Sequence, residues 1–296
     1  MRFLKRALSV ILLVLLVAFG AAYGFAQREL GRTYAVARKA PTPTTDSIAL
    51  ARGEHLATAI GKCADCHGDD FGGSLVIDDP ALGRVGAPNL TGGRGGVGSI
   101  RTDADFAAAI RHGVGPAGKP LLIMPAHDYT YLSEADLQAL IGFLRSRPNV
   151  DRETPARRLG PVGLALIASK KLPLSAALID HAVVQPDSVP QGPTAEYGRY
   201  LANVGGCTGC HNPSLSGGEI IGAPPGTPQA ANLTPGGRSW TLELFRTTLR
   251  TGQRPGGGGE LNAFMPIRFT KLMTDEEIEA VWRYVVSVPA KTLGEP

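Results

Sequence analysis

The apolar positions near the start of the chain form one uninterrupted run. It covers 20 uncharged residues from Ala7 to Ala26, with three basic residues ahead of it. That length is typical of a membrane-spanning helix, because the apolar region of a secretory signal has only about 7–15 residues. The positive charges place the following residues on the outer side of the membrane. We therefore expect residues 1–26 to be a signal-anchor, with a signal peptide cleaved near Gly24-Phe25-Ala26 as the alternative.

Two later segments have the apolar spacing of a helix with one buried face. Their apolar positions recur at i, i+3, i+4 and i+7: Leu137, Leu140, Ile141, Leu144 and Ile278, Val281, Trp282, Val285. Ser133 and Thr274 precede the two segments as N-cap residues, each with an acidic residue three positions later. Shorter helices are predicted at 103–112 and 241–250 and ahead of each cysteine pair. Strand signals are weak, so the predicted fold is all-α with long loops.

The chain repeats one order of motifs: a cysteine pair, Asn-Leu-Thr, a short helix, Met-Pro and a closing helix. Cys63 precedes its counterpart Cys207 by 144 residues. A repeat unit of about 100 residues indicates a duplicated domain. Four parts are predicted after the signal-anchor: a spacer over 27–46, a first domain over 47–148, a linker over 149–193 and a second domain over 194–296.

The predicted linker contains an apolar run from Pro161 to Ser169. This run is too short to cross a membrane, and Lys170 and Lys171 follow it. We expect the linker to pack against both domains, and contact with a membrane surface is the alternative.

Composition and charge narrow the possible functions. Hydrophobic residues make up 43% of the chain and charged residues 19%, as in globular proteins. Aromatic residues make up only 6%, while 38 Gly and 23 Pro predict long loops, so the core should include something besides side chains. Without the three basic residues of the leader, 27 basic residues face 26 acidic ones. This balance and the lack of a basic helix argue against nucleic-acid binding.

All four cysteines belong to two Cys-x-x-Cys-His motifs. Their members are Cys63, Cys66, His67 and Cys207, Cys210, His211. Histidine directly after the second cysteine is typical of covalent haem attachment, in which two thiols bond the porphyrin and the imidazole ligates iron. A four-cysteine zinc site needs no such histidines, and a redox disulfide usually accompanies a βαβ unit, which the sequence does not suggest. A structural disulfide within each pair would close almost no loop.

A methionine followed by proline occupies the same place in both repeats. Met124 lies 57 residues after His67, and Met265 lies 54 residues after His211. The paired spacing favours iron ligands over methionines that only fill a core. Met273, just ahead of the last helix, is the weaker alternative in the second repeat.

The remaining histidines and the Asn-Leu-Thr motifs have simpler explanations. We expect the four other histidines to be solvated or hydrogen-bonded: His55, His112, His127 and His181. Asn-Leu-Thr at 89–91 and 232–234 matches a glycosylation sequon. Its occurrence at equivalent places favours a loop that packs beside the haem.

Together, the Cys-x-x-Cys-His, Asn-Leu-Thr and Met-Pro motifs and the closing helices resemble a class I cytochrome c duplicated into a dihaem protein. The resemblance covers most of residues 47–290 and is closer still to membrane-tethered bacterial cytochrome c subunits of periplasmic dehydrogenases. Those subunits often carry three haems, whereas this chain has two attachment motifs. The resemblance implies two covalently attached haem c groups, with the motif histidine and Met124 or Met265 as iron ligands.

The expected function is electron transfer. We expect an inner-membrane protein with both haem domains in the periplasm, or a soluble periplasmic one if the leader is cleaved. The donor would be an exported dehydrogenase or a quinol-oxidising complex, and the acceptor a cytochrome or terminal oxidase. No catalytic residue is expected, because His/Met ligation fills both axial positions. The alternatives are a dihaem peroxidase or sulfur-compound oxidoreductase, and an anchor that only tethers a partner enzyme.

Overall fold

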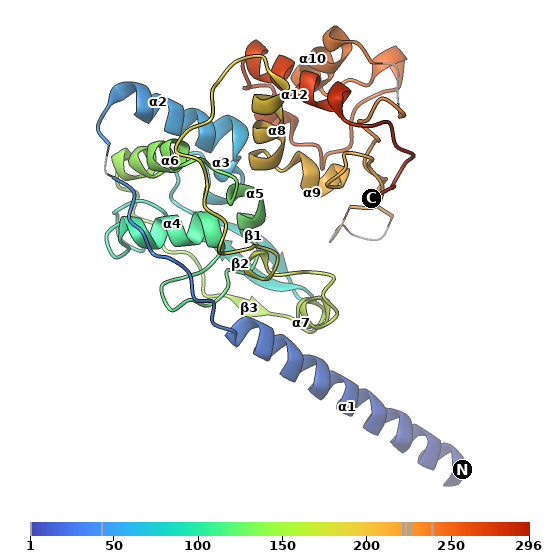
Figure 1. Cartoon of the computed structure of the whole chain (residues 1–296). Coiled ribbons are helices and arrows are strands. Elements are labelled where there is room, and N and C mark those ends of the chain that lie inside the picture. Colours follow the sequence, from blue (N-terminus) through green and yellow to red (C-terminus); the bar gives the residue numbers. More distant parts are fainter. Residues whose placement is uncertain (1, 43, 221–222, 224–225, 238–239) are drawn as a thin grey trace.

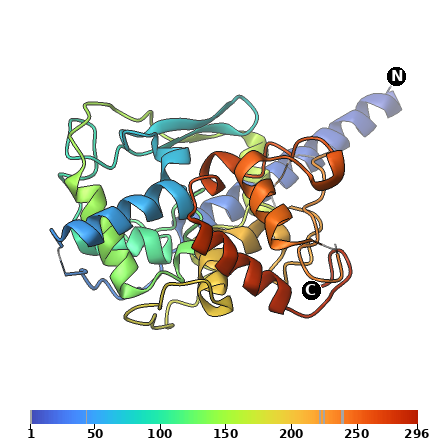
Figure 2. The ribbon, with the colours of Figure 1, turned by 90° about the horizontal axis from the view of Figure 1, so that it is seen from above.

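The computed structural model describes residues 2–42, 44–220, 223, 226–237 and 240–296. Figure 1 shows one long helix, α1 (Arg2–Gly31), projecting from a body made of two helical domains. In Figure 2 the second domain, in orange and red, lies beside the first, in blue and green.

Helix α1 is long and apolar enough to cross a membrane. It continues through residues 27–31, which the sequence assigned to the spacer. Its last turns are docked on the body, because Ala26 is fully buried and Leu30 is 9% exposed. The next residues lie on the first domain, where the Tyr34 amide donates to the Gly118 carbonyl at 2.9 Å. Helix α1 is therefore joined to the rest of the chain without a free tether.

The first domain consists of short helices around the first attachment motif. They are α2 (Ser47–His55), its π-helical continuation η1 (Leu56–Ile60), α3 (Cys63–His67), α4 (Asp103–His112), α5 (Ala126–Tyr129) and α6 (Glu134–Ser146). The closing helix α6 crosses α2 at Gly53, where a Cβ atom would overlap the carbonyl oxygen of Ala139. Only glycine permits this approach of the two backbones.

The second domain repeats this arrangement. Its helices are α8 (Ala195–Val204), α9 (Cys207–His211), α10 (Leu242–Thr251), η3 (Pro255–Gly257), α11 (Ile267–Thr270) and α12 (Asp275–Ser287). Gly198 of α8 meets the Ala280 carbonyl of α12 as Gly53 meets Ala139. Thr274 and Glu277 form the predicted capping box of α12. The helices predicted at 103–112 and 241–250 correspond to α4 and α10.

A small sheet is the one departure from an all-α architecture among the described residues. Strands β1 (Ser74–Asp79), β2 (Gly83–Ala87) and β3 (Arg158–Leu159) are antiparallel in that order. Strand β3 belongs to the linker, which continues as α7 (Pro161–Ala168) and η2 (Ser175–Ala177). The linker then reaches α6, where the Glu134 amide donates to the Pro186 carbonyl at 3.0 Å. Its backbone thus follows the surface of the first domain.

One cluster of buried apolar side chains spans both domains. At the interface α5 packs against α8, and α11 packs against η1. In both cases the short helix after a Met-Pro motif contacts the helix that precedes the other domain's attachment motif. The interface therefore has approximate two-fold symmetry.

Buried ion pairs and hydrogen bonds support this interface. The Arg52 guanidinium donates to Asp136 at 2.8 and 3.0 Å within the first domain and to Glu277 of the second at 3.3 Å. Two further bonds cross between the domains: His55 to Glu277 and Tyr200 to Asp136, both at 2.7 Å. Truncating one member of such a buried cluster leaves an unpaired charge, which is strongly destabilising.

Candidate haem-binding sites

Each attachment motif forms a single helical turn bounded by left-handed residues. Lys62, with φ of 54°, precedes Cys63, and Gly206, with φ of 69°, precedes Cys207. On a helix, side chains at i, i+3 and i+4 share one face. The two cysteines and the histidine of each motif stand at these three positions, so all three side chains could hold one haem, the thiols by covalent bonds and the imidazole as an iron ligand.

A backbone carbonyl orients each motif histidine. The Nδ1 of His67 lies 2.8 Å from the Pro88 carbonyl oxygen, and the Nδ1 of His211 lies 2.8 Å from that of Ala231. Because a carbonyl only accepts, Nδ1 carries the proton and Nε2 keeps its lone pair for iron. Burial lowers the pKa of both imidazoles, against the raising effect of these hydrogen bonds. The neutral, metal-ligating form is thereby favoured.

The Asn-Leu-Thr motifs hold the loops that carry these carbonyls. The buried Asn89 accepts from the Thr91 amide and hydroxyl at 2.9 and 2.8 Å, and its own amide donates to the Val150 carbonyl at 2.6 Å. In the second domain Asn232 donates to the Lys291 carbonyl at 2.7 Å. Each asparagine ties the histidine's carbonyl partner to the segment after the closing helix. This supports the predicted structural loop, because the buried amide nitrogen is not available to a glycan.

The two Met-Pro motifs adopt the same turn. Pro125 has φ −80° and ψ 56°, and Pro266 has φ −81° and ψ 61°. These angles define an inverse γ-turn. In both turns the amide two residues after the methionine donates to the methionine carbonyl at 2.8 Å, in the first domain to Met124 and in the second to Met265. The equivalence of the two methionines thus extends to their backbone geometry.

The attachment motif and the Met-Pro motif of the second domain line one cavity of about 500 Å³. Its lining includes Cys207, Cys210, His211, Met265 and many apolar side chains. Both the volume and this lining are typical of small-molecule and cofactor sites. The residues present therefore fit a haem attached through the two cysteines. Met273 also lines the cavity, but its counterpart in the first domain is Leu132, a buried core residue.

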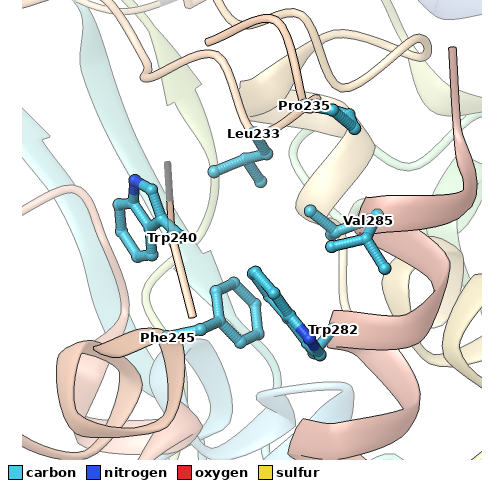
Figure 3. Close-up of a pocket in the computed structure, with 7 residues that line it drawn as sticks. Leu233, Pro235, Trp240, Phe245, Trp282 and Val285 are labelled. Carbon is cyan, nitrogen blue, oxygen red and sulfur yellow. The ribbon is translucent and has the colours of Figure 1, made fainter. Parts of the chain in front are cut away.

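Aromatic side chains extend this apolar space into an adjoining pocket of about 330 Å³. Figure 3 shows Trp240, Phe245 and Trp282 along one side of the pocket, with Leu233 and Val285 on the other. The ring centroid of Phe245 lies 6.0 Å from that of Trp240 and 5.6 Å from that of Trp282. Trp240 and Phe245 were not predicted from the sequence to line a site, although the chain has only two tryptophans.

The first domain contributes to the wall of the second domain's cavity. Lys62, Asp65, His127 and Asp128 line it together with the second attachment motif. The Lys62 ammonium donates to the Gly205 carbonyl. Burial raises the pKa of Asp128, while the charges of His127 and Lys62 oppose that shift.

A reciprocal contact joins the second domain to the first attachment motif. Arg268 of α11 forms an ion pair with Asp69, which lies two residues after His67. The short helix after each Met-Pro motif, α5 or α11, therefore touches the attachment region of the other domain.

The cysteine environments do not support the zinc and disulfide alternatives. All four cysteines lie in described segments, and none forms a disulfide. Burial raises the pKa of the Cys63 thiol to about 12 and also raises that of the other three. Redox-active thiols have lowered pKa values instead. Within the described parts of the chain, no group of three or more His, Cys, Asp or Glu side chains is arranged to hold a metal ion.

The four other histidines are hydrogen-bonded, as expected. His55 contacts Glu277 at 2.7 Å, His112 contacts His181 at 3.1 Å, and His127 contacts the Ser175 hydroxyl at 2.9 Å. Each therefore has a structural partner.

Both domains match families of cytochromes. Residues 49–144 match the family described as cytochrome c oxidase, cbb3-type, subunit III, and residues 195–289 match the family described as cytochrome c. The sequence is similar to the gluconate 2-dehydrogenase cytochrome c subunit of Pantoea cypripedii, with 28% identity over 89% of this chain and 64% of the relative. It is 28% identical to the fructose dehydrogenase cytochrome subunit of Gluconobacter japonicus, over 86% of this chain and 56% of the relative.

A third relative is the cytochrome c subunit of alcohol dehydrogenase (quinone) from Gluconacetobacter polyoxogenes, with 26% identity over 84% of this chain. The chain spans 64%, 56% and 58% of the lengths of these three relatives. The two family matches correspond to the two repeats, and each repeat holds one attachment motif. The chain therefore belongs to the cytochromes c, as a dihaem protein similar to the cytochrome c subunits of dehydrogenases.

Proposed function

We propose that this chain is a membrane-anchored electron carrier with two covalently bound haem c groups. Thioether bonds would form at Cys63, Cys66, Cys207 and Cys210, and the iron ligands would be His67 with Met124 and His211 with Met265. The observation that carries the proposal is the repeated geometry: the same attachment turn, the same histidine–carbonyl bond and the same Met-Pro turn occur in both domains. When bound, a His/Met-ligated haem iron supplies one-electron chemistry at a high potential.

The interface between the domains supports electron transfer from one site to the other within the chain. Lys62 and Asp128 of the first domain line the cavity of the second site. Arg268 of the second domain pairs with Asp69 beside the first site. Because the two attachment regions share this interface, one site can receive an electron while the other delivers one to a separate partner.

The names of the relatives support an exported dehydrogenase as the electron donor. They include the cytochrome subunits of gluconate, fructose and alcohol dehydrogenases. A quinol-oxidising complex is the second candidate donor, and the acceptor would be another cytochrome or a terminal oxidase.

We propose that α1 is retained as a single-pass anchor and that both domains lie in the periplasm. Ala26 and Leu30 form one apolar cluster with Leu164 and Ile167 of α7. Cleavage after Ala26 would remove one member of this cluster and expose the others to water. The basic residues ahead of α1 favour the cytoplasmic side for its start.

The proposal is tested on full-length protein from a host that attaches haem c. We expect a denatured mass that includes two porphyrins and α1, and sulfur-to-iron charge-transfer absorption from both ferric haems. A mass equal to that of the bare chain would overturn the proposal. A high-spin ferric haem with rapid peroxide turnover would instead support the dihaem peroxidase.

The tethering alternative requires a separate measurement. If the protein is an electron carrier, a reduced dehydrogenase should reduce both haems, and an oxidase or cytochrome should reoxidise them. A partner that binds without any change in the haem spectrum would indicate an anchor only.

A further inference from the structure

The linker helix α7 has an apolar outer face without a protein partner among the described residues. Its sequence, Pro161–Ala168, contains no polar side chain. Leu164 and Ile167 on the inner face are buried, whereas Val162 on the outer face is 44% exposed and Ala165 is also exposed. A helix that is apolar on all sides normally lies in an apolar environment. Water is therefore an unfavourable neighbour for the outer face of α7.

This helix lies beside the end of the predicted membrane span. Helix α7 packs against the last turns of α1, where Ala26 and Leu30 join its inner face (Figure 1). The uncharged run of α1 ends at Ala26, and Arg28 follows. Tyr23, which is 49% exposed, lies one turn earlier, and tyrosine is enriched at membrane–water interfaces. The outer boundary of a bilayer around α1 would thus lie at the level of α7.

The residues around α7 have the chemistry of a surface that contacts lipid. Lys170 and Lys171 follow the C-cap residue of the helix, Ser169, and are exposed. Lysines at this position can reach phosphate groups while an apolar helix contacts acyl chains. Leu82 is 37% exposed, and its carbonyl lies against Gly163 of α7, so it extends the same apolar surface.

We propose that α7 lies in the headgroup region of the bilayer that α1 spans, with Val162 and Ala165 toward the acyl chains. Lys170 and Lys171 would then contact anionic phosphates. The inference rests on the proposed anchoring by α1. It also implies a fixed orientation of the first domain, because Leu122 belongs to the same cluster as Ala26 and lies two residues before Met124.

The test uses spin labels on full-length, haem-loaded protein in nanodiscs that contain anionic lipid. All four native cysteines would carry haem, so an introduced cysteine would be the only free thiol. One variant is Val162→Cys. The matched control is Val184→Cys, in the same linker, where the native side chain is 89% exposed. We expect the ratio of oxygen to nickel-complex accessibility at 162 to exceed that at 184 by about threefold or more, because oxygen concentrates in lipid and the complex stays in water.

Two results would overturn the proposal. Equal ratios at both positions would place α7 in water, and a label at 162 that neither reagent reaches would indicate a protein cover. The denatured mass of the same sample separates this proposal from the anchor. A full-length chain with a water-exposed label contradicts only the membrane contact, whereas a chain without α1 contradicts both.

A charge variant gives a second measurement. Replacing Lys170 and Lys171 by glutamine should raise the nickel accessibility at 162 in discs with anionic lipid. An unchanged accessibility would overturn the proposed contact of these lysines with phosphates.

Discussion

The ammonium group of Lys62 in the first domain donates to the Gly205 carbonyl in the second. Lys62 directly precedes Cys63, and Gly205 lies two residues before Cys207. One side chain therefore bridges the two attachment motifs, and its positive charge lies at the wall of the second site.

Replacing Lys62 by methionine should lower the reduction potential of the second haem by tens of millivolts. A nearby positive charge disfavours the ferric state, which carries one more positive charge than the ferrous state. Redox titration of the full-length protein measures the effect. The matched variant Lys62→Arg keeps the charge and should leave the potential close to its original value. Equal potentials in the Met and Arg variants would contradict an electrostatic role for Lys62.

The second-domain methionine ligand can be identified by comparing Met265→Leu with Met273→Leu. We expect Met265→Leu to remove half of the charge-transfer absorption of the ferric protein and to lower one potential, because leucine cannot ligate iron. Met273→Leu nearly conserves volume in a core position and should cost less than about 1.5 kcal/mol without changing the spectrum.

The outcome of this comparison decides between the two methionines. Loss of the absorption in Met273→Leu alone would assign that residue as the ligand. The first domain offers an internal control, because its Met124 is unchanged in both variants.

The crossings of the first and last helices of each domain predict a strict requirement for glycine. Gly53→Ala or Gly198→Ala would place a methyl group against a backbone carbonyl that cannot move away easily. We expect each change to lower the free energy of unfolding by about 3 kcal/mol or more, at the upper end of overpacking effects. Gly115→Ala is the matched control, since its Cβ would meet only ordinary contacts. Denaturant titration followed by circular dichroism measures the effect, and equal midpoints for all three variants would contradict it.

Local sequence patterns predicted the elements that depend on local interactions. The range 103–112 coincides with α4, because its N-cap Thr102 and the left-handed Gly113 bound the helix within the sequence itself. The closing helices likewise begin after Ser133 and Thr274. The helices predicted ahead of the two cysteine pairs correspond to α2 with η1 and to α8.

Features that depend on distant partners were not predicted. Strand β1 has exposed residues on both faces, and two of the five residues of β2 are glycines, so no clear alternation of apolar and polar side chains marks either strand. The bond between His55 and Glu277 joins residues 222 positions apart, and each looks like an ordinary helix-surface residue in the sequence. The sequence likewise did not predict that Lys62 and Asp128 line the cavity of the second site, because they belong to the other domain.

Acid should weaken the contact between α4 and the linker through His112. The Nε2 of His181 lies 3.0 Å from the Ala176 carbonyl and therefore donates, which leaves its Nδ1 to accept from the Nδ1 of His112 at 3.1 Å. The bond itself needs only the Nδ1 proton of His112, so it is burial, rather than loss of this bond, that disfavours a second proton on the ring. Burial, with the charges of His181 and Arg111, lowers the pKa of His112 from 6.5 to about 4.

The sign of the pH effect follows from this lowered pKa. The unfolded chain binds a proton at His112 near pH 6.5, whereas the folded chain binds it only near pH 4. The free energy of unfolding is therefore unaffected by this group above pH 6.5 and falls as the pH decreases from 6.5 toward 4. The variant His112→Gln cannot titrate, so its stability should decline less steeply over this range. Denaturant titrations at several pH values measure the two slopes, and identical slopes would show that His112 binds its proton over the same pH range in the folded and unfolded states.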